Sequence, residues 1–328
     1  MAEAVLLNSF VDLPIRVLLA VGFFVALRVL KFPDLTIEAT FVAGGVGAAW
    51  GATQYDSSLA GLLVAVMLGA VGGSLTALLY AVHRTPVFKL LASVIVMFSF
   101  YSINFRLLGN KSDVNFASEP TALNRLTDWE ALNGYNKVRP FSTLLGYLIV
   151  AVVLCCLYLL FRTDIGVLLR SIGARASLVA SCGRNPTVLL WLGLALSNAI
   201  VALAGWLAAS SSGNININTF GTIIHALAAL VLGEMLVDVV PRLKHKTVSV
   251  ATTLAIPLIG ASLYQLLTAA VTYILTIQTR DGSVMTVWTP RPQDQNLFFS
   301  FLLTVVIIAA RLLQWNRRTV GIAEADAL

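Results

Sequence analysis

The stretch RTDIGVLLRSIGARASLVASCGRNP (residues 162–186) separates two apolar runs, FSTLLGYLIVAVVLCCLYLLF (141–161) and TVLLWLGLALSNAIVALAGWLAAS (187–210). Neither run contains Asp, Glu, Lys or Arg. Each has about the 20 residues that an α-helix needs to cross a hydrocarbon core of roughly 30 Å. The two runs therefore predict membrane-spanning helices, and the four arginines between them predict a loop outside the bilayer.

The rest of the chain has the same character. Of its 328 residues, 58% are hydrophobic and 12% are charged, and the mean hydropathy is +0.85. Soluble domains carry roughly 25% charged residues, so we expect an all-α polytopic membrane protein in which residues 1–328 form one transmembrane domain. The formal net charge of +6 fits basic residues gathered in cytoplasmic loops. We expect the lipid bilayer as its surroundings and no nucleic-acid partner.

Hydropathy predicts about nine (8–10) membrane segments, some of them broken or re-entrant. Segment 35–53 is rich in Gly and Ala, which let helices approach closely, and we expect a broken helix or an incomplete span there. Segment 248–277 contains Pro257 and Gly260, which predict a kink and leave room for more than one crossing element. The expected segments are 11–30, 35–53, 58–82, 88–108, 141–161, 187–210, 219–237, 248–277 and 296–315.

Short basic loops predict the orientation of the chain. Residues 162–184 carry a net charge of +3, and both 241–246 (PRLKHK) and the C-terminal tail are basic. Placing these stretches in the cytoplasm puts the N-terminus outside and the C-terminus inside. Residues 109–140 then form an extracytoplasmic loop, in which we expect a short helix on the membrane surface. The start of the chain has acids and no basic residue before its apolar stretch, so we expect no cleaved signal peptide.

The loop at 162–186 has a helical pattern of its own. Ile165, Leu169, Ile172 and, further on, Leu178 follow a helical period, and two glycines allow breaks. One or two short amphipathic helices are expected. Two functions remain open for them: a helix lying on anionic lipid with its arginines outward, or an element that docks into a groove of a cytoplasmic partner.

Three longer stretches resemble a known family. They are LRSIGARASLVASCGRNPTVLLWLGLALSNAIVALAGWLAA (169–209), LKFPDLTIEATFVAGG (30–45) and NTFGTIIHALAALVLGEML (218–236). They are similar to the permeases of bacterial binding-protein-dependent ABC importers of the branched-chain amino acid and ribose type, in particular to a subgroup labelled tryptophan/tyrosine permeases. Nearly the whole chain resembles this family. The acidic EAA form of the motif found in other importers is absent, since Ser177 and Leu178 stand in its place.

The resemblance implies a division of labour between several proteins. Two copies of the chain would form the pathway as a homodimer in the bacterial cytoplasmic (inner) membrane, and an external substrate-binding protein would deliver a small polar organic solute, an amino acid or a related compound. The loop would couple each copy to a separate cytoplasmic ABC ATPase that holds the ATP and Mg²⁺. The residues implied in this coupling are Arg170, Ile172, Gly173, Arg175, Ala180, Gly183 and Arg184. The chain itself contains no GxxxxGK[ST] phosphate-binding motif.

Polar residues inside apolar segments are candidates for the pathway, because such groups in a membrane usually face a partner or a cavity. They are Thr36, Glu38, Asn104, Asn198, His225 and Glu234. Asp34 and Glu38 are four residues apart, which places both carboxylates on one helical face. Asp34 is favoured as a cap of the helix start, and for Glu38 pairing with a basic side chain is equally plausible.

His225 and Glu234 also keep two interpretations each. His225 either packs against a neighbouring helix through a hydrogen bond or lines the pathway with Asn104 and Asn198. Glu234 either bridges to the arginines of the loop or occupies a packing or surface position. Arg28 and Lys31 are expected to extend to the membrane interface.

Other classes of protein fit the sequence less well. No combination of residues predicts a catalytic site, and the three cysteines and three histidines show no metal-ligand spacing. We therefore expect a transport subunit rather than an enzyme, with no metal site. The main alternative is an ion-coupled secondary transporter, which would place carboxylates at breaks in its helices.

Overall fold

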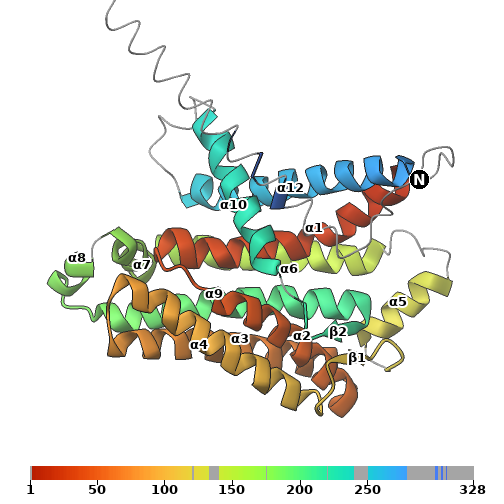
Figure 1. The fold of residues 1–328 in the computed structure, drawn as a ribbon, viewed down its shortest axis with the longest axis horizontal. Coiled ribbons are helices and arrows are strands. Elements are labelled where there is room, and N and C mark those ends of the chain that lie inside the picture. The colour runs from red at the N-terminus through yellow and green to blue at the C-terminus, as the bar shows by residue number, and fades with distance from the viewer. Residues whose placement is uncertain are drawn as a thin grey trace, which may run out of the picture.

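The computed structural model describes residues 2–119, 122–132, 140–174, 176–219, 221–239, 250–278, 300–301, 304–305 and 308. Helices dominate this part of the chain, as Figure 1 shows. They are α1 (Ala2–Phe24), the π-helical turn η1 (Val25–Val29), α2 (Thr36–Tyr55), α3 (Ser58–Val82), α4 (Pro86–Leu107), α5 (Ala122–Leu132), α6 (Pro140–Arg162), α7 (Asp164–Ala174), α8 (Ala176–Ser181), α9 (Pro186–Ser212), α10 (Thr222–Val239) and α12 (Val250–Gln278). Two short strands, β1 (Asp113–Asn115) and β2 (Asn214–Asn216), pair antiparallel.

The all-α prediction is confirmed apart from this small ribbon, but the count of nine spans is not confirmed. Within the described residues, six helices are long and apolar enough to cross a membrane: α1 with η1, α3, α4, α6, α9 and α12. Segments 35–53 and 219–237 form α2 and α10, which do not meet these criteria; the apolar part of α10, Thr222–Val237, is too short. Most of segment 296–315 lies outside the described residues. Segment 248–277 forms a single helix that continues through Pro257.

The two ends of the helix bundle differ in composition. At one end, which we call the basic end, lie α7, α8 and the turn between α3 and α4. In this turn the Arg84 guanidinium donates to the Thr187 hydroxyl at the start of α9 (2.7 Å), and close to it the Lys89 ammonium donates to the Lys31 carbonyl oxygen (3.2 Å). At the other, the ribbon end, lie β1, β2, α5 and the turn between α2 and α3. The helices are therefore bounded by polar caps at both ends, as expected for segments that cross an apolar layer.

The distribution of side chains on α3 fits a lipid environment and not an aqueous one. Its inward face carries small residues such as Gly61, Ala65 and Gly69, which are buried. Its outward face carries large apolar residues at helical spacing. These are Leu59, Leu63, Met67, Val71, Leu75, Leu78 and Val82. A stripe of exposed apolar side chains along a whole helix is stable in lipid and would be unfavourable in water.

The helix α2 is the centre of the bundle. It is buried along most of its length and packs between α3 and α9. Glycines make this packing possible: a Cβ atom on Gly205 would lie 1.8 Å from the Phe41 carbonyl oxygen, and one on Gly44 would lie 1.9 Å from the Ala202 carbonyl oxygen. The backbones of α2 and α9 therefore approach more closely than any side chain would allow.

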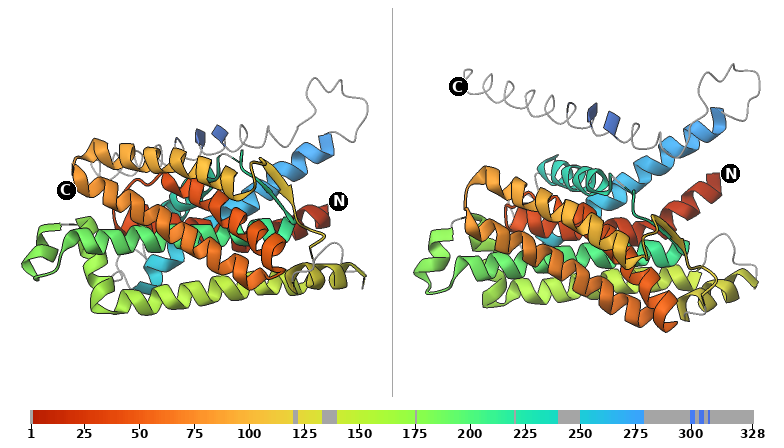
Figure 2. Two further views of the ribbon diagram at one scale, coloured as in Figure 1. Left: turned by 90° about the horizontal axis from the view of Figure 1, so that it is seen from below. Right: turned by 60° about the horizontal axis from the view of Figure 1, so that its bottom comes forward.

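The remaining helices lie around this centre. Figure 2 shows α3 and α4 on one side of the molecule and α12 on the other. The helix α1 packs against both α9 and α12, and α10 packs mainly against α12 and α1. The α10–α12 pair is thus joined to the α2–α3–α9 centre chiefly through α1.

Candidate functional site

The chain folds back into the bundle before α2 begins. Asp34 and Thr36 are buried, and the Thr36 hydroxyl bonds to the carbonyl oxygen of Ser93 (3.2 Å), two turns inside α4, and to the hydroxyl of Thr76 (2.7 Å). The helix therefore starts inside the bundle and not at its basic end. The expectation of a broken or incomplete span at 35–53 agrees with this geometry.

Buried hydrogen bonds fix the start of α2. The Asp34 carboxylate accepts from the Thr36 amide (2.9 Å) and from the Asn198 side chain (2.7 Å), and the Thr40 hydroxyl donates to Asn198 Oδ1 (2.8 Å). Asn198 lies twelve residues after the start of α9 at Pro186, about 18 Å along the helix. The capping role predicted for Asp34 is observed, and its second oxygen joins α2 to the middle of α9.

Glu38 has a partner that the sequence did not indicate. Its carboxylate accepts hydrogen bonds from three successive backbone amides at the start of α10, those of Gly221 (2.5 Å), Thr222 (3.0 Å) and Ile223 (2.9 Å). Of the two alternatives left open for Glu38, pairing with a basic side chain is not seen among the described residues. The amides at a helix start lack partners within the helix and carry partial positive charge. The N-terminal end of α10 therefore pairs with the Glu38 carboxylate as a basic side chain would.

The helix α10 also begins inside the bundle. The strand β2 lies at the ribbon end, and the amide of Gly221, five residues after its last residue, bonds to the buried carboxylate of Glu38. At the other end of α10, Glu234 forms an ion pair with Arg28 of η1. Two interpretations were left open for Glu234, and the ion pair observed is with Arg28 and not with a described arginine of the loop. Arg28, expected to extend to the interface, therefore makes a contact between two helices.

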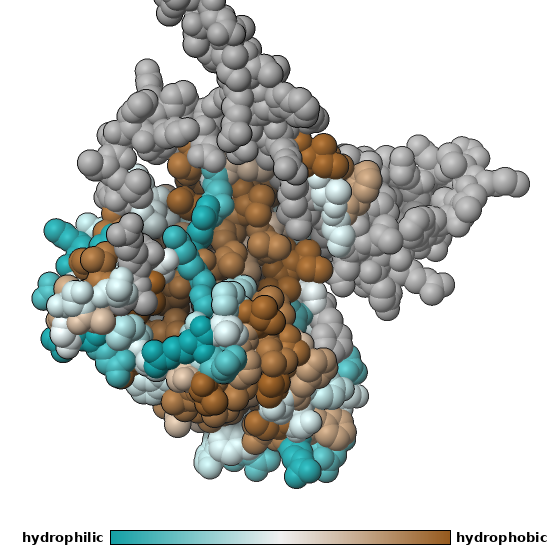
Figure 3. Space-filling model, turned by 60° about the vertical axis from the view of Figure 1, so that its left-hand side comes forward, coloured by the Kyte–Doolittle hydropathy of each residue, from teal (hydrophilic) through white to brown (hydrophobic). Residues whose placement is uncertain are grey.

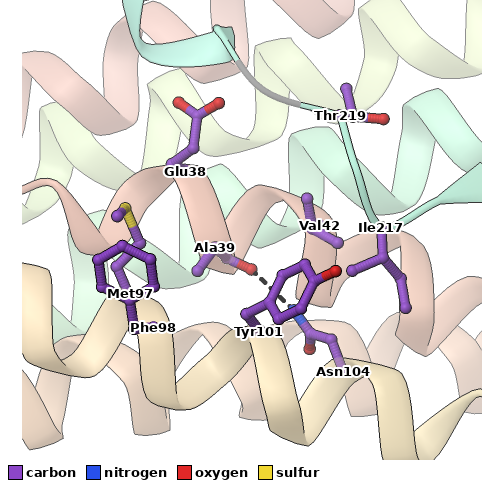
Figure 4. A pocket seen from close by; sticks show the side chains of 9 residues that line it. All are labelled: Glu38, Ala39, Val42, Met97, Phe98, Tyr101, Asn104, Ile217 and Thr219. Carbon is purple, nitrogen blue, oxygen red and sulfur yellow. Dashed lines mark hydrogen bonds between the residues drawn. The ribbon is translucent and has the colours of Figure 1, made fainter. Parts of the chain in front are cut away.

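A cavity of about 210 Å³ lies beside Glu38, between α2, α4 and the segment after β2. Figure 4 shows its lining, with the Glu38 carboxylate directed away from the aromatic residues of α4. The lining residues are Glu38, Ala39, Val42, Met97, Phe98, Tyr101, Asn104, Ile217 and Thr219. The Asn104 side-chain amide donates to the Ala39 carbonyl oxygen (3.2 Å) and so holds α4 to α2 at the cavity wall.

Four of the six predicted pathway residues lie in this region. Glu38 and Asn104 line the cavity, and Thr36 and Asn198 belong to the buried network next to it. His225 lies elsewhere: its Nδ1 atom bonds to the Tyr264 hydroxyl of α12 (2.7 Å). The structure therefore does not bring His225 together with Asn104 and Asn198, although its predicted packing through a hydrogen bond is confirmed.

The loop at 162–186 forms α7 and α8, as predicted. Figure 3 brings this end of the molecule forward and shows hydrophilic side chains lying across an otherwise hydrophobic surface. Arg170 donates to the Phe161 carbonyl oxygen at the end of α6 (3.0 Å). A Cβ atom on Gly173 would lie 2.2 Å from the Val29 carbonyl oxygen, so α7 touches the backbone of η1. Gly183 has a φ of +71°, which glycine adopts without strain.

The apolar residues of this loop divide into two sets. Leu169 and Val179 are 3% and 0% exposed, while Ile165 and Leu178 are 49% and 52% exposed. Ile172 and Gly173 are half-buried, and Ala180 and Arg184 are exposed. Arg175 lies outside the described residues. One apolar set thus fastens the loop to the bundle, and the other leaves an apolar surface open beside the basic residues.

Several residues of the site were not predicted. Thr40, Phe98 and Tyr101 face the network or the cavity, and Tyr264 contacts His225. The spacing of Thr36 and Thr40, one helical turn apart, is a signal that places Thr40 on the same face. The aromatic residues of α4 carry no such signal, because apolar side chains on a membrane helix also face lipid.

Comparison with known proteins gives a consistent result. The family model described as "Branched-chain amino acid transport system / permease component" matches residues 5–311. A tyrosine transport system permease protein of Clostridioides difficile is 26% identical over 249 residues, which cover 76% of each chain. An uncharacterized protein of Rickettsia prowazekii is 26% identical over 70% of this chain and 75% of its own length.

A shorter match is found with a nucleoside ABC transporter permease protein of Lactococcus lactis subsp. cremoris. It is 32% identical over 95 residues, which cover 28% of this chain and 30% of that protein. No solved structure matches the chain.

Proposed function

The chain belongs to the branched-chain amino acid transport system permease family, and from this premise we propose that it is the membrane subunit of a binding-protein-dependent ABC importer. In this proposal the subunit forms the pathway for a small polar organic solute, an amino acid or a related compound. A separate ATPase, which holds the ATP and Mg²⁺, drives the transport. The names of the relatives, which include tyrosine and nucleoside permeases, support a small organic solute.

The observation that carries the proposal is the attachment of α7 and α8 to the bundle. The loop is fastened on one side by Arg170 and Gly173 and keeps Ile165 and Leu178 exposed on the other. A force applied to the open surface would reach η1 and α6 directly, because both contacts are made to backbone carbonyl oxygens of these elements. This is the geometry expected of an element that a cytoplasmic ATPase grips and displaces.

The arrangement in the membrane follows from the same proposal. The basic end faces the bacterial cytoplasm and the ribbon end faces outward, with the N-terminus outside and the C-terminus inside. An external binding protein docks at the ribbon end and releases the solute there. A second copy of the chain completes the pathway as a homodimer, so that two α7–α8 loops meet two ATPase subunits.

One observation favours a second candidate function, an ion-coupled secondary transporter. Asp34 and Glu38 lie buried at helix starts inside the bundle. Carriers of that class use such sites for ions. In this chain, however, both carboxylates accept hydrogen bonds from backbone amides at helix starts, which supports a structural capping role for them.

Reconstitution separates the two functions. The chain is placed in liposomes with the ATPase and the binding protein proposed as its partners, and uptake of radiolabelled amino acids is measured with and without ATP. We expect uptake only with ATP and no effect of an ionophore that removes ion gradients. Gly183→Asp and Arg175→Glu should abolish uptake while the chain remains folded. Uptake driven by an ion gradient without the ATPase would overturn the proposal.

A further inference from the structure

The turn between α3 and α4 carries basic side chains at the level of a membrane surface. Both helices are long and apolar enough to cross a membrane, so residues 83–85, which join them, lie where the hydrocarbon layer ends. Figure 2 shows the two helices side by side up to this turn. Arg84 belongs to the turn, Lys89 follows it in the first turn of α4, and the Lys31 carbonyl oxygen accepts from the Lys89 ammonium group (3.2 Å). Three basic residues thus gather around one turn of the chain.

The Lys89 side chain is half-buried between three segments. Its ammonium nitrogen lies 5.7 Å from the centre of the Phe32 ring and 5.8 Å from the centre of the Tyr80 ring. These two rings pack edge to face, with 5.3 Å between their centres. Ring faces attract a cation, but an ammonium group has three N–H donors, and the Lys31 carbonyl oxygen is the acceptor of one. Among the described residues, two donors of a half-buried cation are therefore left without an acceptor.

Arg84 has a similar excess of donors. Its Nη2 atom donates to the Thr187 hydroxyl (2.7 Å), which holds the side chain towards the start of α9. This is the one hydrogen bond of the Arg84 side chain within the described part of the chain, although a guanidinium group has five N–H donors. None of the three basic residues forms a salt bridge with a described carboxylate. The positive charge at this turn can therefore be balanced by an anion from outside the chain.

Apolar side chains flank this charge on the surface of the bundle. Val82, at the end of α3, and Val87, at the start of α4, are 79% and 77% exposed. Each valine is two residues away from a basic residue, Arg84 or Lys89. Further along the two helices, the exposed apolar residues include Leu75, Leu78, Leu90 and Leu91. A surface suited to acyl chains thus meets a set of donors suited to an anion.

The chemistry of the donors indicates which anion fits. A guanidinium group matches the geometry of a phosphate with two parallel hydrogen bonds, and an ammonium group adds a point charge. A soluble anion would use these donors but not the apolar side chains, whereas a phospholipid uses both. The headgroup should carry net negative charge, because the cationic group of a zwitterionic headgroup would be placed beside three basic side chains.

We infer that an anionic phospholipid binds at this turn, with its phosphate held by Lys31, Arg84 and Lys89 and its acyl chains lying on α3 and α4. Lys31 belongs to the segment that leads into the buried start of α2, so the lipid would hold this segment against α4. The inference adds a lipid ligand to the proposed function and does not depend on which solute the chain transports.

Two lipids with the same acyl chains test the inference. Dioleoylphosphatidylglycerol or dioleoylphosphatidylcholine is added to the purified chain in detergent, and bound lipid is measured by native mass spectrometry. We expect the dissociation constant of the phosphatidylglycerol to be at least about fivefold lower than that of the phosphatidylcholine. In Lys31→Gln/Arg84→Gln/Lys89→Gln the two constants should differ by less than about twofold. Equal affinities in the unaltered chain, or an unchanged preference in the triple variant, would overturn the inference.

Three exposed basic residues at the ribbon end provide a matched control. Arg106→Gln/Lys111→Gln/Arg125→Gln removes the same formal charge and should keep the preference for phosphatidylglycerol. An equal loss of preference in both triple variants would mean that net charge and not this turn attracts the lipid, which would overturn the assignment. If the first triple variant does not fold, Lys31→Gln/Arg84→Gln, which alters two exposed side chains, should still weaken the preference, and an unchanged preference there would overturn it.

Two further measurements separate a lipid from other anionic partners. Inorganic phosphate in excess should leave the bound phosphatidylglycerol in place, and its displacement would assign the turn to a soluble phosphate instead. The triple variant at the turn should also still co-purify with the ATPase. Loss of the ATPase with the lipid preference retained would assign the turn to that protein. These measurements involve no transport, so failure of ATP-driven uptake and failure of lipid binding are separate results.

Discussion

The helices α2 and α10 both begin inside the bundle, yet they are joined to its centre in different ways. Glycine-mediated backbone contacts join α2 to α3 and α9 along its length. The helix α10 is joined to α2 through Glu38 at its start and to η1 through the Arg28–Glu234 ion pair near its end. Close packing thus holds α2 against the centre of the bundle, while α10 packs against α12 and α1 and reaches α2 and η1 through polar contacts at two points. Substitutions of the glycines between α2 and its neighbours should therefore affect folding, and substitutions of the polar contacts of α10 should affect transport.

The largest effect is expected where two backbones touch. Gly205→Leu places a side chain 1.8 Å from the Phe41 carbonyl oxygen, and no rotamer relieves a clash of the Cβ atom itself. We expect little or no folded protein, measured as the monodisperse peak in gel filtration of the detergent extract. Gly109→Asn is the control, because Gly109 has a φ of +68° with nothing near its Cβ position, and asparagine tolerates that conformation. A normal yield of Gly205→Leu would contradict the close packing.

Removing the Glu38 carboxylate should reduce transport more than it reduces folding. Hydrogen bonds to charged groups contribute about 1.5–3 kcal/mol each, and Glu38→Ala would leave three amides of α10 without this acceptor. We expect ATP-driven uptake to fall by more than tenfold, with ATPase binding retained. Glu38→Gln keeps one carbonyl oxygen and should be milder.

Glu130 provides a matched control for this prediction. It is also buried, and its carboxylate accepts from the Phe141 and Ser142 amides at the start of α6. Glu130→Gln makes the same chemical change far from α10 and should leave uptake per folded molecule unchanged. An equal loss of uptake in Glu38→Gln and Glu130→Gln would mean that Glu38 acts through general stability.

The ion pair at the other end of α10 should have a smaller effect. Arg28 is 54% and Glu234 26% exposed at the side chain, and exposed ion pairs contribute about 0.2–1 kcal/mol. We expect Arg28→Glu to lower uptake severalfold, because it sets two carboxylates together, and the double variant Arg28→Glu/Glu234→Arg to restore most of it. If the double variant is no better than Arg28→Glu, the pair does not act as a contact between the two charges.

The smallest effect is expected at His225. His225→Phe and Tyr264→Phe each remove the hydrogen bond between α10 and α12, at a cost of about 1 kcal/mol. Both should lower the melting temperature by a few degrees, alter the uptake rate modestly and leave ATPase binding intact. Unchanged uptake in His225→Ala would remove this residue from the pathway candidates.

The features that could be predicted from the sequence are those that neighbouring residues determine. Membrane-length apolar runs, the two short helices of residues 162–186 and the capping role of Asp34 each follow from neighbouring residues. The partners of Glu38 and Glu234 were missed, because they lie about 180 and 200 residues away. Hydrophobic periodicity in the sequence does not indicate such long-range contacts. The ribbon was missed for the same reason, since its strands have three residues each and are about 100 residues apart in the sequence.

The depth of α2 and α10 was also beyond local patterns. The Gly- and Ala-rich composition of 35–53 indicated an unusual span, but the fold-back that buries Asp34 depends on the packing of α3, α4 and α9 around it. The cavity belongs to the same class of feature. Its lining comes from α2, α4 and the segment after β2, which meet only in the folded chain.

The most direct measurement of the central claim uses the native cysteine in the loop after α8. Cys182 is exposed, and the variant Cys155→Ala/Cys156→Ala removes the other cysteines. A membrane-impermeant maleimide is applied to intact spheroplasts and to inside-out vesicles, with and without the co-expressed ATPase. Labelling of Cys182 only in inside-out vesicles, and its suppression by the ATPase, is the predicted result. Labelling from the outside, or labelling that the ATPase leaves unchanged, would contradict an importer driven through this loop.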